Sequence, residues 1–322
     1  MRFVITGANG HIGNNLVRLI LNTYPDCEVV CLLRKTFDRA LDGLKVTITT
    51  GDIADESFLK SVINKGDLVL SSAGVIDLKN NKKEETDKIN YQAVKTLVKV
   101  CKENHAEKFV LVGSVDGVYK EKMDELIVEP TDFYPEKLQG NYAVSKARAM
   151  KFVLDEMKKD ENLNFAIALP SAVIGPNDFK PSAVGKVVLG VVNNQAEFGI
   201  KGGYNFVSVD FVAQGLLKLL TTKNKGVYFL AGECVSVEKM YFTLNGIAKV
   251  DRKPIILPTF LAKMLSPFIP VLNKITLKTL LENPDYSSSK AVKELDLVKE
   301  PFIETAKKTY DWFRKNANLF NK

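Results

Sequence analysis

The sequence predicts an α/β protein in which a doubly wound parallel sheet is followed by a smaller C-terminal part. Short, nearly continuous apolar runs alternate with stretches whose apolar residues recur at helical spacing, which is typical of parallel strands covered by helices on both faces. After about residue 170 the alternation weakens, and prolines such as Pro176, Pro181 and Pro258 divide the chain into short pieces. We therefore expect a second part built from short segments that interleave with the sheet.

The expected elements follow one another in a strand–helix rhythm. Strands are predicted at residues 3–6, 28–33, 46–50, 68–71, 108–113 and 165–169, and again at 204–209 and 226–230. Helices are predicted at 12–20, 87–104, 141–159 and 210–220. We expect a first domain over residues 1–170, to which 204–232 partly returns, and a second part over 171–322.

Composition and charge exclude several classes of protein. Of the 322 residues, 46% are hydrophobic and 26% are charged, so the chain is not disordered and can bury a full core. Its formal net charge is +7, and the basic run 79–83 is followed at once by Glu84 and Glu85, which indicates a solvated loop. No nucleic acid is expected as a partner.

Cysteines, histidines and the first residues bear on metal binding and location. The four cysteines lack Cys-x-x-Cys spacing and only His11 and His105 accompany them, so no metal site is expected and the thiols should be free in a reducing compartment. Strand-like residues begin at Arg2, which argues against a signal peptide, and no run of ~18 apolar residues could cross a membrane. We therefore expect a cytoplasmic protein without a transmembrane segment.

Three glycines mark a phosphate-binding turn between the first strand and the first helix. In Thr6-Gly7-Ala8-Asn9-Gly10-His11-Ile12-Gly13, the glycines allow a tight turn, a close approach to a pyrophosphate, and close packing of the helix on the sheet. The N–H groups at the start of the helix would face the phosphates. Because the motif follows a strand and opens a helix, it predicts a dinucleotide site. The residues expected to bind the cofactor here are Gly7, Asn9, Gly10, His11, Ile12 and Gly13.

The ends of the following strands predict which dinucleotide binds. Arg34 ends the second strand and no carboxylate occurs before Asp38; an arginine there can pair with a 2′-phosphate, whereas an acid would bind the ribose hydroxyls. NADP(H) is therefore the expected cofactor, with NAD(H) as the alternative. Further residues expected to contact the cofactor follow the third and fourth strands: Asp52, Ile53, Ser72, Ala73 and Gly74.

Tyrosine and lysine residues four positions apart share one face of a helix, so a Tyr-x-x-x-Lys pair can hold an ammonium near a phenol. The chain contains three such pairs: Tyr91 and Lys95, Tyr142 and Lys146, and Tyr286 and Lys290. Ligands of parallel sheets bind beyond the carboxyl ends of the strands. Ser114 directly follows the fifth strand and Tyr142 begins the next helix, so Ser114, Tyr142 and Lys146 are the expected catalytic residues.

Together these motifs resemble those of the extended short-chain dehydrogenase/reductases, also called the NAD-dependent epimerase/dehydratase family. The resemblance includes the glycine turn, Gly51-Asp52-Ile53, Ser114, Tyr142-Ala-Val-Ser-Lys146, Leu169-Pro-Ser-Ala-Val-Ile-Gly-Pro176 and Val207-Ser-Val-Asp210-Phe-Val-Ala213. Arg34 and the segment Gly113-Ser-Val-Asp-Gly-Val-Tyr119 are most similar to the dihydroflavonol-4-reductase-like branch. Membership implies a Rossmann fold and an NAD(P)-dependent enzyme.

The resemblance also implies roles for individual residues. Tyr142 would be the general acid that protonates a carbonyl oxygen, and Ser114 would hydrogen-bond the same oxygen. Lys146 would contact the nicotinamide ribose and lower the pKa of Tyr142. Asn90 matches a family asparagine, for which we expect a structural role. The residues expected to border the nicotinamide are Pro170, Ser171 and Val173.

Two departures from the family pattern bear on the substrate. The fourth strand ends in Ser71-Ser72-Ala73-Gly74 where many relatives carry His-x-Ala-Ala, and Leu169 stands where members that act on nucleotide sugars usually have an arginine. The C-terminal part is rich in apolar side chains between Phe179 and Ile269. We therefore expect a mostly apolar carbonyl or alcohol as substrate, unless these side chains only form the core of the second part.

Three functions fit these residues. The first is an NADPH-dependent reductase of a ketone or aldehyde. The second is an NAD(P)-dependent epimerase, dehydratase or 3β-hydroxysteroid-type dehydrogenase on the same scaffold. The third is a cofactor-sensing binding protein without turnover, although such relatives usually lose the tyrosine or the lysine.

Two expectations concern contacts outside the site. Helices 87–104 and 141–159 match those that pair relatives as dimers, so a homodimer with an apolar seam is expected. Contact of residues 258–281 with a membrane surface, to collect an apolar substrate, is an alternative role for that segment.

Overall fold

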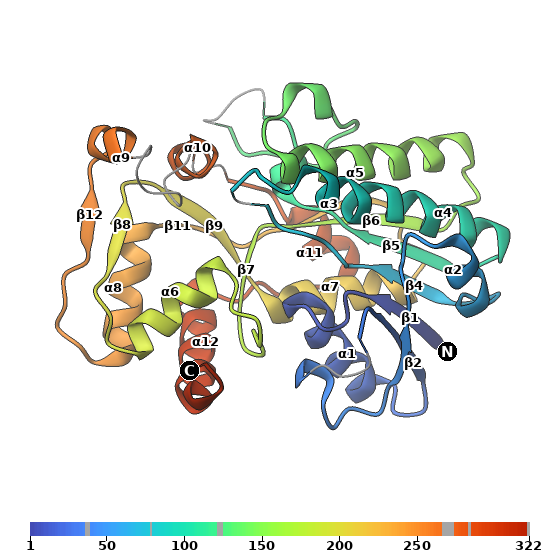
Figure 1. Ribbon diagram of the computed structural model, residues 1–322, viewed down its shortest axis with the longest axis horizontal. Coiled ribbons are helices and arrows are strands. Elements are labelled where there is room, and N and C mark those ends of the chain that lie inside the picture. Colours follow the sequence, from blue (N-terminus) through green and yellow to red (C-terminus); the bar gives the residue numbers. More distant parts are fainter. Residues whose placement is uncertain (36–38, 78, 121–124, 266–273, 283–284, 321–322) are drawn as a thin grey trace.

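A seven-stranded parallel sheet with the order β10-β6-β5-β4-β1-β2-β3 forms the centre of the protein (Figure 1). The computed structural model describes residues 1–35, 39–77, 79–120, 125–265, 274–282 and 285–320. The strands are β1 (Arg2–Thr6), β2 (Glu28–Leu33), β3 (Thr47–Thr50), β4 (Leu68–Ser71), β5 (Lys108–Val112), β6 (Phe165–Pro170) and β10 (Gly226–Leu230). The strand order reverses at β1, which confirms the predicted doubly wound sheet.

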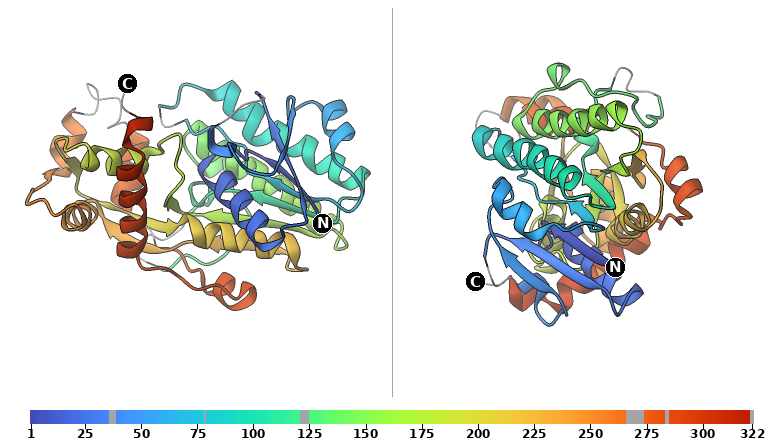
Figure 2. Two further views of the ribbon diagram at one scale, coloured as in Figure 1. Left: turned by 90° about the horizontal axis from the view of Figure 1, so that it is seen from below. Right: turned by 90° about the vertical axis from the view of Figure 1, so that its right-hand side faces the viewer.

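Helices cover both faces of this sheet because its strands bury alternate residues on opposite sides. In β1, Phe3 and Ile5 belong to one core cluster and Val4 to the other. The first cluster includes side chains of α1 (His11–Thr23), α7 (Val209–Thr221) and α11 (Ser289–Leu295). The second includes side chains of α2 (Glu56–Val62), α4 (Ala93–Glu103) and α5 (Asn141–Lys159). Figure 2 shows α4 and α5 side by side on their face of the sheet.

The second part contains two small sheets and its own core. β7 (Ala172–Ile174), β9 (Gly203–Ser208) and β11 (Glu233–Ser236) form one sheet, and β8 (Phe198–Ile200) and β12 (Ile255–Leu257) form the other. The helices are α6 (Ala183–Val192), α8 (Val237–Ala248), α9 (Thr259–Leu265), α10 (Lys274–Glu282) and α12 (Phe302–Lys315). Within residues 204–232, β9 belongs to the three-stranded sheet. By contrast, α7 packs on the large sheet and β10 is one of its strands.

The helix predicted over residues 87–104 differs from a regular α-helix. It begins earlier, with α3 (Lys83–Asp87), and passes through a π-helical turn, η2 (Lys88–Gln92), before α4. Within this turn the Asn90 side chain forms two hydrogen bonds with the backbone of Val75. Its Oδ1 accepts from the Val75 N–H at 2.8 Å, and its Nδ2 donates to the Val75 carbonyl oxygen at 3.0 Å. A π turn of this kind inserts one residue into a helix and often marks a functional region.

The outer faces of α4 and α5 are charged. Lys99 pairs with Glu56 at 2.7 Å, and Lys102 pairs with Glu156 at 2.6 Å. Both helices are completely described, and their large aliphatic side chains are buried or partly buried within the subunit. The homodimer expected through these helices, and its apolar seam, stay predictions.

The segment 258–281 is described only in part, since residues 266–273, including Phe268 and Ile269, lie outside the described residues. In α9, Phe260 and Met264 are 69% and 63% exposed. Among the helices that the structure describes, none has the length and apolar character needed to cross a membrane.

Candidate active site

The glycine-rich turn between β1 and α1 leaves no room for side chains. Gly7 has a φ of +69°, and a Cβ atom there would lie 2.5 Å from the backbone nitrogen of Ala73. A Cβ at Gly13 would lie 2.2 Å from the Gly7 carbonyl oxygen, which also accepts a hydrogen bond from the Gly10 N–H at 2.9 Å. The turn thus packs against α1 and the end of β4 at distances that only glycine permits.

The N-terminus of α1 can receive an anion. Gly10 is the N-cap, the first turn contains no acidic residue, and no described side chain caps this end. The helix therefore presents N–H groups and the positive end of its dipole beside Asn9. His11 has a structural contact instead, because its Nε2 lies 3.0 Å from the Pro176 carbonyl oxygen and burial lowers the pKa of its imidazole. Ile12 packs against the core.

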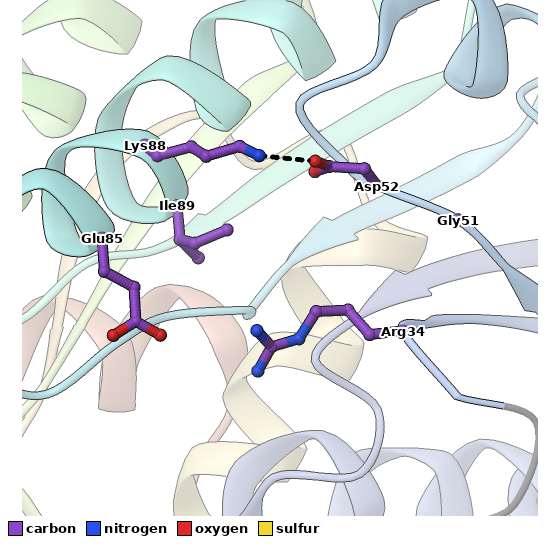
Figure 3. A pocket seen from close by; sticks show the side chains of 6 residues that line it. All are labelled: Arg34, Gly51, Asp52, Glu85, Lys88 and Ile89. Carbon is purple, nitrogen blue, oxygen red and sulfur yellow. Dashed lines mark hydrogen bonds and ion pairs between the residues drawn. The ribbon is translucent and has the colours of Figure 1, made fainter.

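A surface pocket of about 430 Å³ lies beyond β2 and β3 (Figure 3). Its lining residues are Arg34, Gly51, Asp52, Glu85, Lys88 and Ile89. Lys88 donates to Asp52 Oδ2 at 2.7 Å, and this bond holds the pKa of the Asp52 carboxyl below its usual value. Figure 3 shows Arg34 and Glu85 pointing into the same space. Ile53, which was also expected at the cofactor, packs against the core behind the pocket.

The loop after β4 joins the glycine turn to the catalytic helix. The Ser72 hydroxyl donates to the Thr6 carbonyl oxygen at 2.6 Å, and the Ala73 N–H donates to the Thr6 hydroxyl at 3.2 Å. Ser72, in the segment that departs from the family pattern, therefore ties the ends of β4 and β1 together. A Cβ at Gly74 would lie 3.4 Å from Asn90 Oδ1 and from Lys146 Nζ, so the loop reaches the catalytic lysine.

Ser114, Tyr142 and Lys146 come together at the carboxyl end of β5. Ser114 caps the short helix η3 (Val115–Gly117), and its hydroxyl is near enough to the Tyr142 phenol to act on the pKa of that phenol. Lys146 lies one turn after Tyr142 on α5 and donates to the Val112 carbonyl oxygen at 2.8 Å. Burial lowers the pKa of its ammonium to about 8. The three expected catalytic residues therefore share one site beside Gly74.

The acidity of Tyr142 differs from the expectation that Lys146 would lower it. Burial raises the pKa of the phenol, and the charge of Asp116 raises it further. The Ser114 hydroxyl lowers the same pKa, but not enough to cancel these two effects. The Lys146 ammonium is meanwhile directed at the Val112 carbonyl oxygen. In this arrangement Tyr142 is a protonated group, which suits a proton donor.

Asn90 has the structural position expected for it. Besides its two bonds to Val75, its amide donates to the Ser145 hydroxyl at 3.0 Å. Ser145 in turn donates to the Tyr142 carbonyl oxygen at 2.9 Å. Asn90 thus fixes the loop after β4 to the first turn of α5.

The other two Tyr-x-x-x-Lys pairs lie in different surroundings. Tyr91 packs under the Arg148 guanidinium, 4.0 Å from its ring centre, and Lys95 lies 5.5 Å from the same ring. Lys290 donates to the Val227 carbonyl oxygen at 2.9 Å, and the Tyr286 ring stacks 5.2 Å from Phe229. Neither pair combines with a serine and the glycine turn as Tyr142 and Lys146 do.

Directly after β6, Ser171 has a buried hydroxyl that lacks a partner among the described residues. Its side chain is 7% exposed, and its Oγ bonds to no described residue. A buried unpaired hydroxyl is costly unless a ligand satisfies it. Pro170 ends β6 beside it, and Val173 follows in β7. The glycine turn, the open helix N-terminus and this hydroxyl together fit a bound dinucleotide, with its nicotinamide toward Ser171.

Four polar side chains near Tyr142 were missed by motif analysis. Asp116 accepts a hydrogen bond from the Ser114 hydroxyl over 3.4 Å. Lys120 forms an ion pair with Glu282 of α10 at 3.5 Å. Burial, together with the negative charge of Asp116, raises the pKa of Tyr204 in β9 to about 12. No single motif contains these residues, since three separate segments supply them. Only the position of Asp116, two residues after Ser114, gave a signal in the sequence.

Several apolar residues expected to line the substrate pocket form a core instead. Val188 is fully buried among α6, α8 and α12, with Val184 and Val187 packed beside it. Phe179 packs edge-to-face on Trp312, with ring centres 5.2 Å apart. Among the described residues, no group of three side chains could hold a metal ion.

Comparisons with known proteins agree with this site. The profile of the NAD dependent epimerase/dehydratase family matches residues 3–231. Sterol demethylase protein B of Methylococcus capsulatus is 25% identical, over 99% of this chain and 100% of its own length. A candidate dihydroflavonol 4-reductase of Synechocystis is 25% identical, over 98% of this chain and 95% of its own length.

Solved structures show the same fold. The crystal structure of UDP-glucose 4-epimerase from Thermotoga maritima superposes with a TM-score of 0.80 over 98% of this chain and 100% of its own, at 15% identity. Its likeness extends through both parts of the molecule. From the profile match and the site together, the chain belongs to the NAD dependent epimerase/dehydratase family and is an NAD(P)-dependent enzyme of the extended short-chain dehydrogenase/reductase type.

Proposed function

We propose that the protein is an NADPH-dependent oxidoreductase that reduces a ketone or an aldehyde. The observation that carries the proposal is the grouping of Ser114, Tyr142 and Lys146 at the carboxyl end of β5, beside Gly74 and the glycine turn. A phenol that is protonated, lies beside a hydroxyl and stands one helical turn from a lysine can donate a proton to a carbonyl oxygen.

In this proposal the chain binds, orients and protonates the substrate, and bound NADPH supplies the hydride. Tyr142 donates its phenolic proton to the carbonyl oxygen. Ser114 donates a hydrogen bond to the same oxygen and fixes its position. The positive charge of Lys146 stabilises the phenolate that proton donation leaves on Tyr142, and its ammonium would also hold the ribose.

A preference for NADP(H) over NAD(H) rests on Arg34. Lys88 is already paired with Asp52, whereas Arg34 forms no ion pair with a described residue and points into the pocket (Figure 3). An arginine at the end of β2 can bind a 2′-phosphate through two hydrogen bonds. Glu85 faces the same space and would oppose a phosphate, so the preference depends on the guanidinium alone.

The proposed substrate is a mostly apolar carbonyl compound. Leu169 supplies no charge where nucleotide-sugar relatives carry an arginine, and two relatives of nearly equal length are named for a sterol and for a flavonoid-type reduction. The end of the substrate near Tyr142 would meet Asp116 and Lys120, so we expect a polar group close to the reacting carbon.

A second candidate is a 3β-hydroxysteroid-type dehydrogenase, which would use the same residues to oxidise an alcohol. The sterol-related relative favours this alternative. Epimerase or dehydratase chemistry is a third use of the scaffold, for which Leu169 removes an expected sugar contact.

We also propose a cytoplasmic location, which the four cysteines, all free thiols in this structure, support. A homodimer paired through an apolar seam of helices 87–104 and 141–159 is also proposed. Sedimentation of the 35.8 kDa chain as a single monomeric species at micromolar concentration would contradict it.

The function is tested by screening ketones, aldehydes, hydroxysteroids and nucleotide sugars with NADPH and NADH, following nicotinamide absorbance. Turnover of apolar carbonyls that is lost in Tyr142→Phe is expected. Saturable turnover of a nucleotide sugar, with none for apolar carbonyls, would overturn the proposal.

A further inference from the structure

Asp116 occupies a position beside the general acid that the proposed roles of Ser114, Tyr142 and Lys146 do not explain. It lies in η3, whose neighbouring glycines allow this short helix to pack directly on α5. A Cβ at Gly113 would lie 2.4 Å from Met150 Sδ, and one at Gly117 would lie 2.3 Å from Met150 Cε and 3.1 Å from the Ala147 nitrogen. This close packing brings Asp116 to the turn of α5 that follows Tyr142.

The contacts of Asp116 link it to Tyr142 through Ser114. The Ser114 hydroxyl donates to Asp116 Oδ2 over 3.4 Å. Its oxygen, Ser114 Oγ, also accepts a hydrogen bond from the Asp116 N–H at 3.2 Å. Both Ser114 and Asp116 are near enough to the Tyr142 phenol to act on its pKa, Asp116 raising it and Ser114 lowering it. Burial raises the pKa of Asp116, while Lys120 and Ser114 favour its charged form.

The other charged and titratable groups around Asp116 do not cancel its charge. Lys120 is the neighbouring cation, but it is shared with Glu282 of α10 at 3.5 Å. Tyr204 of β9 and the Tyr286 phenol also lie in the field of Asp116, which adds to burial in raising their pKa values. On the other side of Tyr142, Lys146 is bonded to Val112. Two carboxyl groups therefore face one lysine on this side of the phenol.

We propose that Asp116 is a positioning residue that acts on the general acid: its carboxylate keeps Tyr142 protonated, so that the site is better suited to donate a proton to a carbonyl than to remove one from an alcohol at neutral pH. The inference rests on the proposed function of this same site. Its physical basis is that Asp116 and Tyr142 are two acids close together. A negative charge on Asp116 disfavours a second negative charge on the phenol.

The test measures the ionisation of residue 142 directly. Replacing Tyr142 with 3,5-difluorotyrosine in the full chain gives a phenol of lower intrinsic pKa, whose ¹⁹F chemical shift reports its protonation without interference from the other tyrosines. We compare pH titrations of this protein with and without Asp116→Asn. The midpoint is expected to fall by at least about 0.5 pH units when the carboxylate is removed. No cofactor or substrate is needed, so this result is independent of whether the protein reduces carbonyls.

Three further variants separate charge from structure. Asp116→Glu keeps the charge and should leave the midpoint close to that of the parent. Asp116→Ser supplies a second neutral variant if the asparagine protein does not fold. Glu282→Gln removes the other carboxylate that pairs with Lys120 but has no contact with Ser114, and it should shift the midpoint less than Asp116→Asn. An unchanged midpoint in both neutral variants, or equal shifts for Asp116→Glu and Asp116→Asn, would overturn the proposal.

Discussion

The cofactor half of the site and its proposed substrate half are formed by different kinds of chemical group. The cofactor half consists mainly of backbone: a tight turn through Gly7 and Gly13 and the N-terminus of α1. The substrate half consists of side chains that come from separate segments, among them Lys120 after η3, Tyr204 in β9 and Glu282 in α10. The first is one continuous piece of chain, and the second exists only after the two parts of the molecule have packed together.

This difference shows how one scaffold serves different substrates. A backbone site depends on the absence of side chains, so most substitutions at its glycines damage it. A site made of side chains changes with each substitution, while the sheet that supports it stays intact. We therefore expect mutations at the glycines of the turn to abolish function and those of side chains in either half to alter rates or preferences.

The largest expected effect is that of Gly13→Ala. The new Cβ would lie 2.2 Å from the Gly7 carbonyl oxygen, so either α1 or the turn must move, and the N–H groups that face the phosphates would be displaced. Cofactor binding measured by calorimetry should become undetectable. The matched control is Gly246→Ala in α8, where a Cβ meets nothing within 4 Å and alanine favours the helix by about 1 kcal/mol. If Gly13→Ala binds NADPH normally, the cofactor half does not have the strict geometry described here.

The next effect is that of Tyr142→Phe. Removing the phenolic hydroxyl should lower turnover by ~10²-fold or more while leaving cofactor affinity nearly unchanged, because the loss is in proton donation. Initial rates and cofactor titrations measure the two quantities separately. Tyr91→Phe serves as the control, since Tyr91 packs under Arg148 and away from Ser114, and it should behave like the wild type. Full activity of Tyr142→Phe would remove Tyr142 from its role.

A smaller effect is expected at the adenosine end of the cofactor half. The wild type should bind NADP(H) at least about tenfold more tightly than NAD(H), a difference of about 1.4 kcal/mol, and Arg34→Ala should remove most of that difference. Titrations with both cofactors decide this. Equal affinities in the wild type, or the same preference after the substitution, would show that another group selects the cofactor.

The smallest expected effect is a pH dependence of cofactor binding. Burial lowers the pKa of Lys146 to about 8 in this structure, so its ammonium is charged below that pH and loses its proton above it. Affinity for NADPH should therefore fall by a few-fold as the pH rises through about 8, since only the charged ammonium can donate three hydrogen bonds and attract the anionic cofactor. In Lys146→Arg, where the cation does not titrate, the decline should be absent. A pH-independent affinity in the wild type would contradict this role.

The cofactor half could be predicted from the sequence because its signals are local. Gly7, Gly10 and Gly13 stand between a strand and a helix, and this context specifies what the turn must do. The placement of Ser114 after β5 and of Tyr142 at the start of α5 followed from the same strand–helix rhythm. The structure brings these residues together at the expected edge of the sheet.

The substrate half could not be predicted, for the opposite reason. Lys120 and Glu282 are ordinary charged residues in their own segments, and their pairing depends on how α10 folds back over the site. Short strands such as β7 and β8 have three residues each, too few for an alternating pattern to be recognised. Apolar residues such as Val188 could not be assigned to a pocket or to a core by hydrophobicity alone. Whether such a residue lines a pocket or belongs to a core is decided by tertiary packing.

The π-helical turn at Lys88–Gln92 changes the direction in which side chains point along one helical segment. The residues before it and the residues after it therefore face directions that a single regular α-helix would not provide. Each residue of an α-helix turns the chain by about 100°, so an added residue changes which face the preceding part presents. The segment before and within the turn directs Glu85 and Lys88 to the cofactor pocket, while α4 keeps Val94 and Leu97 in the core. Deleting one residue here would restore a regular helix and rotate Glu85 and Lys88 about the helix axis relative to α4. A single-residue length change in this turn would thus alter the lining of the pocket together with the Asn90 contacts that fix the loop after β4.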